Sequence, residues 1–341
     1  MKKLVQGSKI GIVGDANVDF VYHVNKLPPA GGEVLAGSHS IQLGGSAANV
    51  ALGLARLGFN ARLLACVGAD DWGIRIRSEL LSCGVDVGSI VESAMEPTQA
   101  NVVMVTNDAE RTMVSYRGAS KRLAAAHVTE GWISGCQTVF LSGYSLLEEP
   151  QAGAARRVVE MARRRGLRVV LDVPVVLSSA FKIGSYYPDI DVLVLGVAEL
   201  AELTGEADQI RGVEAIRSRG TTYVAIKEGP EGASLHGPEG RCSVRGLDVE
   251  VLDTTGAGDS FTAGLIAGFE YGLGERALLL LANTMGALAT VRQGAGLSLP
   301  VVAEVQRMLK KLEADEELSG LAREVLRCLA DYPERSTVPA A

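Results

Sequence analysis

The sequence lacks features that would assign it to several common classes. Its longest purely apolar run, Ala277 to Ala282, is interrupted at Asn283, far short of a membrane span. It also lacks a basic excess, because 33 Lys and Arg stand against 40 Asp and Glu and give a formal charge of −7. We therefore expect no nonspecific binding to nucleic acid or to a membrane surface.

Paired cysteines and clustered histidines are absent as well. The five cysteines are odd in number, scattered and without a Cys-x-x-Cys pair, which is typical of reduced thiols in the cytoplasm and gives no metal site. The four histidines are isolated, so we expect structural or surface roles for them. The start Met1-Lys2-Lys3 leads at once into a polar segment and is not expected to be a signal peptide.

What the chain does have is the composition of an ordinary globular protein. It has 341 residues, of which 47% are hydrophobic and 21% charged. This length can form one large α/β domain or two smaller ones.

Strand and helix patterns alternate along most of the chain, which favours a mainly parallel central sheet flanked by helices on both faces. The predicted strands are 9–14, 62–67, 87–91, 138–141, 168–172, 192–195 and 223–226. The predicted helices are 46–57, 72–83, 151–165 and 276–291.

Two segments break this alternation, because their strands follow one another with no helix between them. They are 16–44 and 98–117, the second with a hairpin turn at Asn107-Asp108. We predict that they form a small, discontinuous β lid. The core would then comprise 1–15, 45–97 and 118–332, with a loosely ordered tail at 333–341.

The stretch from Asp253 to Asp259 is the most informative segment. It reads Asp-Thr-Thr-Gly-Ala-Gly-Asp and is expected to join a strand at 248–252 to a long apolar helix. Its glycines allow close backbone approach, and a helix N-terminus binds anions. A carboxylate at Asp259 would repel a phosphate, so it either accepts a proton from an attacking hydroxyl or simply caps the helix. Spacing alone leaves both interpretations open.

Polar side chains also gather near the predicted lid. Asn17 and Asp19 offer donors and acceptors for vicinal hydroxyls, although such residues also form turns. Asn49 follows the double glycine Gly44-Gly45 and is either a pocket residue or a helix-start residue.

The exact residues of two segments are more specific than the spacing of their glycines and polar residues. The stretch from Asp253 to Asp259 resembles the C-terminal signature of the ribokinase-like (PfkB) sugar kinases, and 44–58, beginning Gly-Gly-Ser-Ala-Ala-Asn, resembles their upstream signature. The resemblance implies a ribokinase-like fold and ATP-dependent phosphorylation of a hydroxyl. It implies Asp259 as the base beside an anion cradle of Gly256, Ala257 and Gly258.

The same resemblance implies a sugar pocket and a monovalent cation site. The implied sugar-binding residues are Asn17, Asp19, Gly45, Ser46, Asn49, Arg117 and Asp253. Asp253 with Thr255 would hold K⁺, as in related kinases. Arg117 either binds a substrate carboxylate or phosphate, or is a solvated arginine at the lid edge. Ser46 replaces the Lys of enzymes acting on ribose, and the Ser142-Gly143-Tyr144 turn lacks their glutamate, which argues against strict ribokinase activity.

On the nucleotide side, the resemblance implies ATP and Mg²⁺. Lys227, Gly229 and Gly232 would form the phosphate-side loop, and Asn283 would face the adenine edge unless it is a satisfied core residue. Glu199 would hold Mg²⁺ through water. Gly196 departs from the family's Asn three residues before that Glu, which puts a nucleotide-side hydrogen bond in question.

We therefore predict a cytoplasmic carbohydrate kinase that acts on a sugar or sugar-like molecule. Its exposed lid edges favour a homodimer through the lids. A catalytically decayed sugar-binding sensor, or a nucleoside or vitamin kinase of the superfamily, remain alternatives.

Overall fold

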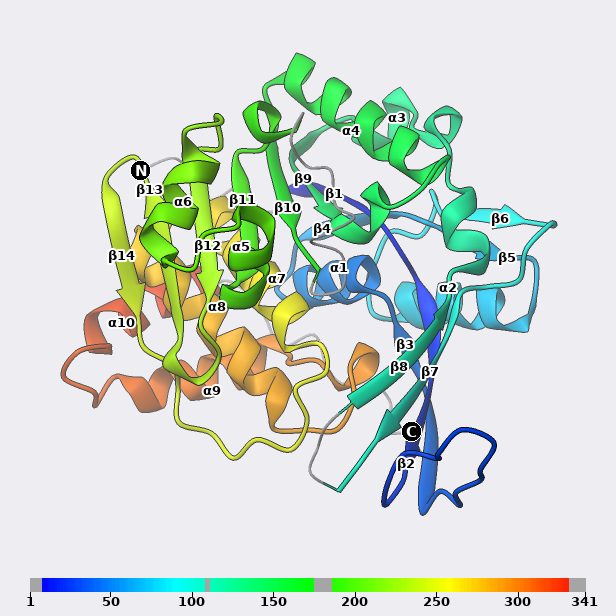
Figure 1. Ribbon diagram of the computed structural model, residues 1–341. Helices are drawn as coiled ribbons and strands as arrows, with labels where there is room; N and C mark the ends of the chain where they lie inside the picture. Colours follow the sequence, from blue (N-terminus) through cyan, green and yellow to red (C-terminus); the bar gives the residue numbers. More distant parts are fainter. Residues whose placement is uncertain (1–7, 108–110, 175–185, 331–341) are drawn as a thin grey trace.

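An eight-stranded sheet forms the centre of the molecule (Figure 1). The computed structural model describes residues 8–107, 111–174 and 186–330, so Asp108 and the predicted tail 333–341 lie outside the described residues. Neighbouring strands are parallel except where β13 pairs with β12 and β14. In spatial order the strands are β14 (Gly240–Val244), β13 (Ala233–Gly237), β12 (Tyr223–Lys227), β11 (Val192–Gly196), β10 (Arg168–Asp172), β9 (Cys136–Ser142), β1 (Lys9–Val13) and β4 (Asn60–Leu64).

Both faces of this sheet are buried, because successive apolar side chains of each strand enter opposite cores. Leu193 packs in one core cluster, for example, and its neighbour Val194 in the other. One face is covered by α1 (Ser46–Arg56), α2 (Asp71–Ser82), α7 (Ala257–Tyr271), α8 (Glu275–Thr290), α9 (Val302–Leu312) and α10 (Ser319–Leu329). The other is covered by α3 (Glu130–Ile133), α4 (Gln151–Arg165), α5 (Val197–Thr204) and α6 (Gln209–Arg217).

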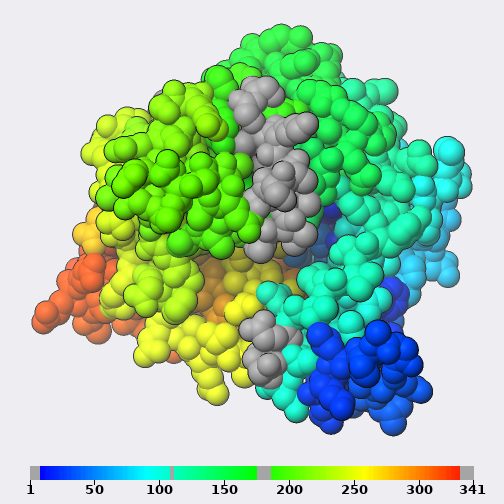
Figure 2. Space-filling model, in the orientation of Figure 1, coloured from blue at the N-terminus to red at the C-terminus, as the bar shows by residue number. Residues whose placement is uncertain are grey.

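A separate four-stranded sheet projects from this core as its own lobe, drawn in blue and teal in Figures 1 and 2. It is built from the two segments that break the strand–helix alternation, and only its central pair, β2 with β7, is parallel. Its strands, in order, are β3 (Ser38–Gly44), β2 (Asn17–His23), β7 (Ala100–Val105) and β8 (Arg111–Tyr116). That this sheet acts as a lid stays a prediction.

Short elements complete the fold. A two-stranded parallel sheet is formed by β5 (Cys66–Gly68) and β6 (Val91–Ser93). The 3-10 helices are η1 (Gly118–Arg122), η2 (Ala125–His127), η3 (Gly143–Leu146), η4 (Tyr187–Asp189), η5 (Gly229–Glu231) and η6 (Gly296–Ser298). None of the described helices is long and apolar enough to cross a membrane. Cys66, Cys83, Cys136 and Cys242 are free thiols.

Three predicted strands need correction. Segment 248–252 has no strand structure, so α7 is preceded by an irregular loop. Segment 62–67 is divided between β4 and β5, which belong to different sheets. Segment 87–91 is mostly a turn, because the Gly88 N–H bonds to the Asp86 side chain and the Ile90 N–H to the Val87 carbonyl.

The strand order predicts a ligand-binding crevice at the carboxyl ends of the strands of the main sheet. The chain passes from β1 to β4 on one side of β1 and returns to β9 on the other. In open α/β sheets, ligands bind outside the carboxyl ends of the strands at such a reversal. Helix α1 packs on α7 with no room to spare, since a Cβ at Gly53 would lie 2.8 Å from the Ala263 Cβ. This contact aligns the N-terminal ends of both helices beside the crevice.

Candidate active site

The predicted base lies in the first turn of α7. Gly256 precedes this helix with φ 75°, a conformation that favours glycine. The Ala257 N–H donates a hydrogen bond to the Thr254 carbonyl at 3.2 Å. The N–H groups of Gly258 and Asp259 lie in the first turn of α7, where the helix provides no backbone carbonyl to accept a hydrogen bond from them. The predicted cradle thus contains donors at Gly258 and Asp259 rather than at Ala257.

The Asp259 carboxylate is held from α1 across the crevice. The Asn49 Nδ2 donates to Asp259 Oδ2 at 2.7 Å. Burial raises the pKa of Asp259 to about 6, although hydrogen bonds from Asn49 and Ser46 oppose the shift. The dipole of α7 therefore does not dominate this carboxyl, and Asp259 is a stronger base than a helix-start aspartate would be. It is still mostly ionised at neutral pH.

The predicted sugar side is a compact network at the start of β2. Asp19 Oδ1 accepts from Asn17 Nδ2 at 2.6 Å and from Asn101 Nδ2 at 2.7 Å. Burial raises the pKa of Asp19, partly offset by these two amides. A Cβ at Gly44 would lie 2.2 Å from Asp19 Oδ2, so the double glycine leaves this carboxylate its space. Sequence reasoning missed Asn101; only the register of β2 on β7 places it opposite Asp19.

Arg117 lies inside the junction between the two sheets. Its Nη2 donates to both oxygens of Asp15 at 3.2 and 3.3 Å and also bonds to Gln151, while its Nη1 lies 3.4 Å from Glu148. The side chain is only 16% exposed, so the alternative of a solvated arginine at the lid edge is wrong. Its carboxylate partner is Asp15, a residue that sequence reasoning left without a role.

Tyr144 is a second missed residue on this side. Burial raises the pKa of Tyr144 to about 12, and the negative charges of Asp259 and Asp15 add to the shift. The phenol thus lies within electrostatic reach of both carboxylates. From the sequence, the Ser142-Gly143-Tyr144 turn is noted only because it lacks a glutamate. A single aromatic residue at the end of a strand does not by itself indicate a functional residue.

Asp253 and Thr255 are bonded to each other and to the loop after α8. Asp253 Oδ1 accepts from the Thr255 N–H at 2.8 Å and from its hydroxyl at 2.6 Å, and Oδ2 accepts from the Gly294 N–H at 2.7 Å. Burial would raise the pKa of Asp253, but these bonds outweigh it and leave the pKa below its ordinary value. The same loop reaches the base, because the Gly296 N–H donates to Asn49 Oδ1 at 3.2 Å.

Lys227 provides a positive charge close to the cradle. Its Nζ donates to Asp172 Oδ1 at 2.9 Å, and Asp172 Oδ2 accepts from Thr262 at 2.6 Å. Burial would lower the pKa of Lys227, but Asp172 outweighs it and the pKa is raised. A Cβ at Gly258 would lie 3.5 Å from this Nζ, so a side chain there would fill the space before the ammonium. A phosphate group fits this glycine, helix end and cation.

Glu199 is buried in the first turn of α5. A Cβ at Gly196 would lie 2.4 Å from Glu199 Oε2, so the departure from the family's Asn makes room for this carboxylate. In the described part of the chain, no group of three or more His, Cys, Asp or Glu side chains could hold a metal alone. A magnesium site at Glu199 stays a prediction; Mg²⁺ commonly binds through one or two carboxylates, water and substrate phosphates. Bound there, Mg²⁺ would neutralise phosphate charge.

The remaining nucleotide-side predictions meet at one strand end. Asn283 Nδ2 donates to the carbonyls of Val244 and Arg245 at 3.0 and 3.1 Å. A Cβ at Gly232 would lie 2.2 Å from the Val244 carbonyl, whereas one at Gly229 would meet nothing within 4 Å. Close backbone packing therefore explains why position 232 is a glycine. At position 229 a side chain would have open space. Contacts of Asn283 and both glycines with a nucleotide stay predictions.

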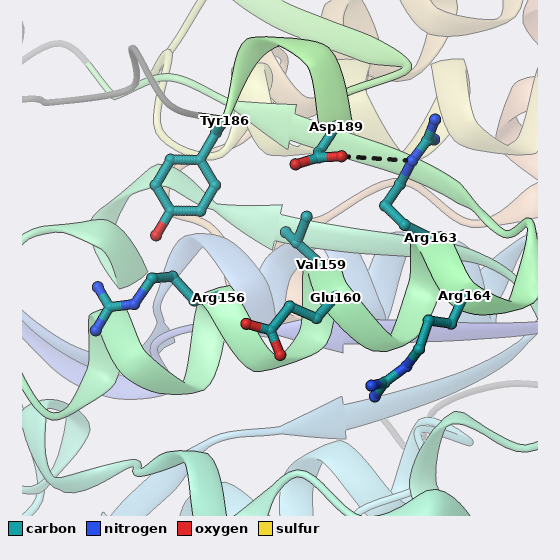
Figure 3. Close-up of a pocket in the computed structure, with 7 residues that line it drawn as sticks. All are labelled: Arg156, Val159, Glu160, Arg163, Arg164, Tyr186 and Asp189. Carbon is teal, nitrogen blue, oxygen red and sulfur yellow. Dashed lines mark ion pairs between the residues drawn. The ribbon is translucent and has the colours of Figure 1, made fainter.

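A surface pocket lies apart from all of these residues. It has a volume of about 430 Å³ and lies along α4. Figure 3 shows its three arginines, Arg156, Arg163 and Arg164, with Arg163 paired to Asp189. None of the predicted site residues lines this pocket.

Comparison with known proteins defines the class of this molecule as a carbohydrate kinase. Residues 8–302 match the family described as pfkB family carbohydrate kinase. The chain therefore belongs to the pfkB family of carbohydrate kinases, and the predicted family is confirmed.

Two curated relatives cover most of the chain. An ATP-dependent ribose-1-phosphate kinase of Halopiger xanaduensis is 34% identical over 83% of this chain and 92% of its own length. A fructokinase of Klebsiella pneumoniae is 31% identical over 88% of this chain and 99% of its own length. The ribokinase of Arabidopsis thaliana complexed with ribose and ATP aligns with TM-score 0.80 and 24% identity over 89% of this chain and 99% of its own. This likeness confirms the ribokinase-like fold.

Proposed function

We propose that this kinase uses ATP to phosphorylate a hydroxyl of a sugar, with Asp259 as the base. One observation carries the proposal: a carboxylate with a pKa of about 6 lies in the first turn of α7, held by Asn49. A base is most effective when its pKa lies near the working pH.

The reaction follows from this placement. The sugar hydroxyl oxygen bonds to the γ-phosphorus of ATP, the bond from that phosphorus to the bridging oxygen breaks, and ADP leaves. The hydroxyl proton passes to Asp259. Donors at Gly258 and Asp259 and the Lys227 ammonium stabilise negative charge on the transferred group. Glu199 would hold Mg²⁺ through water, and the ion would neutralise charge on the phosphates.

The sugar would lie between the β2 network and the base. Asn17, Asp19 and the α1 turn of Gly45 and Ser46 offer the donors and acceptors for its other hydroxyls. Asp253 with the Thr255 backbone would bind K⁺ or the sugar. Arg117 already pairs with Asp15 and Glu148, so the case for a substrate with an anionic group rests on one relative, which is named for a sugar phosphate.

A coupled assay for ADP release tests the proposal. The panel contains ribose, ribose 1-phosphate, fructose, sugar acids, nucleosides and a vitamin alcohol, with and without K⁺. We expect turnover on at least one sugar or sugar phosphate and its loss in Asp259→Asn. Binding without turnover across the panel would instead identify a sensor, and turnover confined to nucleosides or the vitamin would support those alternatives.

We further propose a homodimer through the small sheet, in the cytoplasm. Three large apolar side chains on one face of β7 and β8, Val102, Val114 and Tyr116, are 39 to 63% exposed. Such a surface is commonly covered by a second copy. The free thiols support a reducing compartment.

A further inference from the structure

The small sheet has one polar face and one apolar face. Residues paired directly across its strands lie on the same face, and the next pair along lies on the other. One row from β3 to β8 is polar: Gln42, Asp19, Asn101 and Ser115. The adjacent row is apolar: Ile41, Phe20, Val102 and Val114. A Cβ at Gly294 would collide with the Gln42 amide, so the polar face is the one turned toward the core.

The amide of Asn101 has a fixed orientation within this row. Its Nδ2 donates to Asp19 Oδ1 at 2.7 Å. A carboxylate offers only acceptors, so this bond determines which end of the amide faces Asp19 and leaves the carbonyl oxygen to face elsewhere. The residue is 7% exposed. Among the residues that the structure describes, its buried Oδ1 has no hydrogen-bond partner.

A second amide on this face is in the same situation. Gln99 lies two positions before Asn101, so its side chain leaves the strand on the same side. It is 6% exposed, and its Oε1 is likewise buried without a partner in the described part of the chain. Most buried polar groups of folded proteins have a partner. Two orphaned carbonyl oxygens on one face therefore indicate a missing hydrogen-bond donor, which a hydroxyl group can supply and an anion cannot.

We propose that Asn101 determines specificity in the sugar site, where its Oδ1 accepts a hydrogen bond from a substrate hydroxyl next to the hydroxyl that Asp19 binds. This rests on the proposed function. The substrate class that fits is a sugar with two neighbouring free hydroxyls at the small sheet. A phosphate or carboxylate at that end would be repelled by the Asn101 oxygen and the Asp19 carboxylate. A deoxy sugar is rejected because it leaves the Asn101 oxygen buried and unpaired.

The test measures kcat/KM for the best sugar of the panel and for its monodeoxy analogues, each of which lacks one hydroxyl other than the phosphorylated one. For ribose these include 2-deoxyribose and 3-deoxyribose. Wild type should disfavour one analogue by about 100-fold or more. In Asn101→Ala this ratio should shrink by about tenfold or more, because the oxygen that requires the hydroxyl is gone. The control Thr112→Ala, at an exposed position on the opposite face of the sheet, should keep the wild-type ratio within twofold.

The ratio of the two substrates separates recognition from a structural role. Loss of the Asn101 amide also removes a donor to Asp19, but that damage lowers kcat/KM for the sugar and for its analogue alike. Thermal melting confirms that each variant is folded, and Asn101→Ser, with its shorter side chain, repeats the comparison if the alanine variant does not fold. An unchanged ratio in the variant overturns the proposal. So does a wild type that accepts every analogue within tenfold of the sugar, because water would then satisfy the Asn101 oxygen.

The same assay keeps this proposal distinct from the function itself. If wild type phosphorylates a sugar and Asp259→Asn does not, while Asn101→Ala keeps the wild-type ratio, only the role of Asn101 fails. If wild type phosphorylates nothing in the panel, the proposed function fails and the role of Asn101 fails with it.

Discussion

Replacing Asn49 by alanine should shift the pH dependence of turnover toward higher pH. Asn49 donates to the charged form of Asp259 at 2.7 Å and lowers its pKa. A hydrogen bond to a charged group contributes about 1.5 kcal/mol or more, which corresponds to about one pKa unit. The base of the wild type, with a pKa of about 6, should thus titrate near pH 7 in the variant, by this estimate of about one unit.

The assay is kcat/KM of the sugar for ADP release between pH 4.5 and pH 9 at saturating ATP, because kcat/KM reports the pKa of the enzyme without bound sugar. Protonated Asp259 cannot accept the proton, so wild-type kcat/KM should fall about tenfold from its plateau at pH 5. At pH 6 the variant should retain about one fifth of the wild-type fraction of plateau activity. Asn49 also accepts from the Gly296 N–H, but loss of that bond lowers activity equally at all pH values. The ratio of kcat/KM at pH 6 to kcat/KM at pH 9 therefore isolates the base.

Ser46→Ala serves as a second variant, since Ser46 also lowers the pKa of Asp259. Its acid limb should move in the same direction. A limb that stays in place in both variants, or that moves to lower pH, refutes the reasoning. So does a wild-type limb near pH 4, the ordinary value for an aspartate.

Three further outcomes are expected. Asp259→Asn should raise the free energy of unfolding in urea by about 3 kcal/mol at pH 8, the equivalent of the rise in pKa from 3.8 to about 6. A pKa raised in the folded state costs stability above the ordinary pKa, so the gain should vanish below pH 4. An equal or lower stability at pH 8 would contradict this expectation. Lys227→Met should lower the free energy of unfolding by about 3 kcal/mol, because the Asp172 carboxylate is left buried without its ion-pair partner. The double variant Lys227→Met with Asp172→Asn should regain most of this stability. A double variant as unstable as Lys227→Met would count against the pair. In sedimentation, Val114→Glu should give monomer while Ile210→Glu, on exposed α6, leaves the dimer intact; a monomeric wild type would exclude the dimer.

The main features of the fold follow from the sequence because its periodic signals are strong. The continuous apolar run 192–195 forms a strand whose successive side chains are buried on opposite faces of the sheet. Helix α4 has the predicted bounds Gln151–Arg165. The strand prediction for 248–252 was wrong because the apolar residues of a short segment do not show whether a neighbouring strand is available to pair with it. Its Val251 and Leu252 are 57% and 56% exposed. The short strands β13 and β14 were missed because both carry few apolar residues, and β14 forms the edge of the sheet.

The site was predictable where a residue acts through its position in the chain. The glycines and Asp259 belong to one continuous stretch, so the cradle could be read directly. Asp15, Asn101 and Asp172 could not be found in this way. Each acquires its role from a partner more than 50 positions away, through strand register or ion pairing that only tertiary packing sets.

The central claim is that the Asp259 carboxylate takes the proton of the attacking hydroxyl. The direct measurement is kcat of Asp259→Asn on the best sugar, with the affinities for ATP and sugar determined by calorimetry on the same preparation. The account predicts a loss in kcat of at least about 100-fold with both affinities within threefold of wild type. A kcat within threefold of wild type would contradict it.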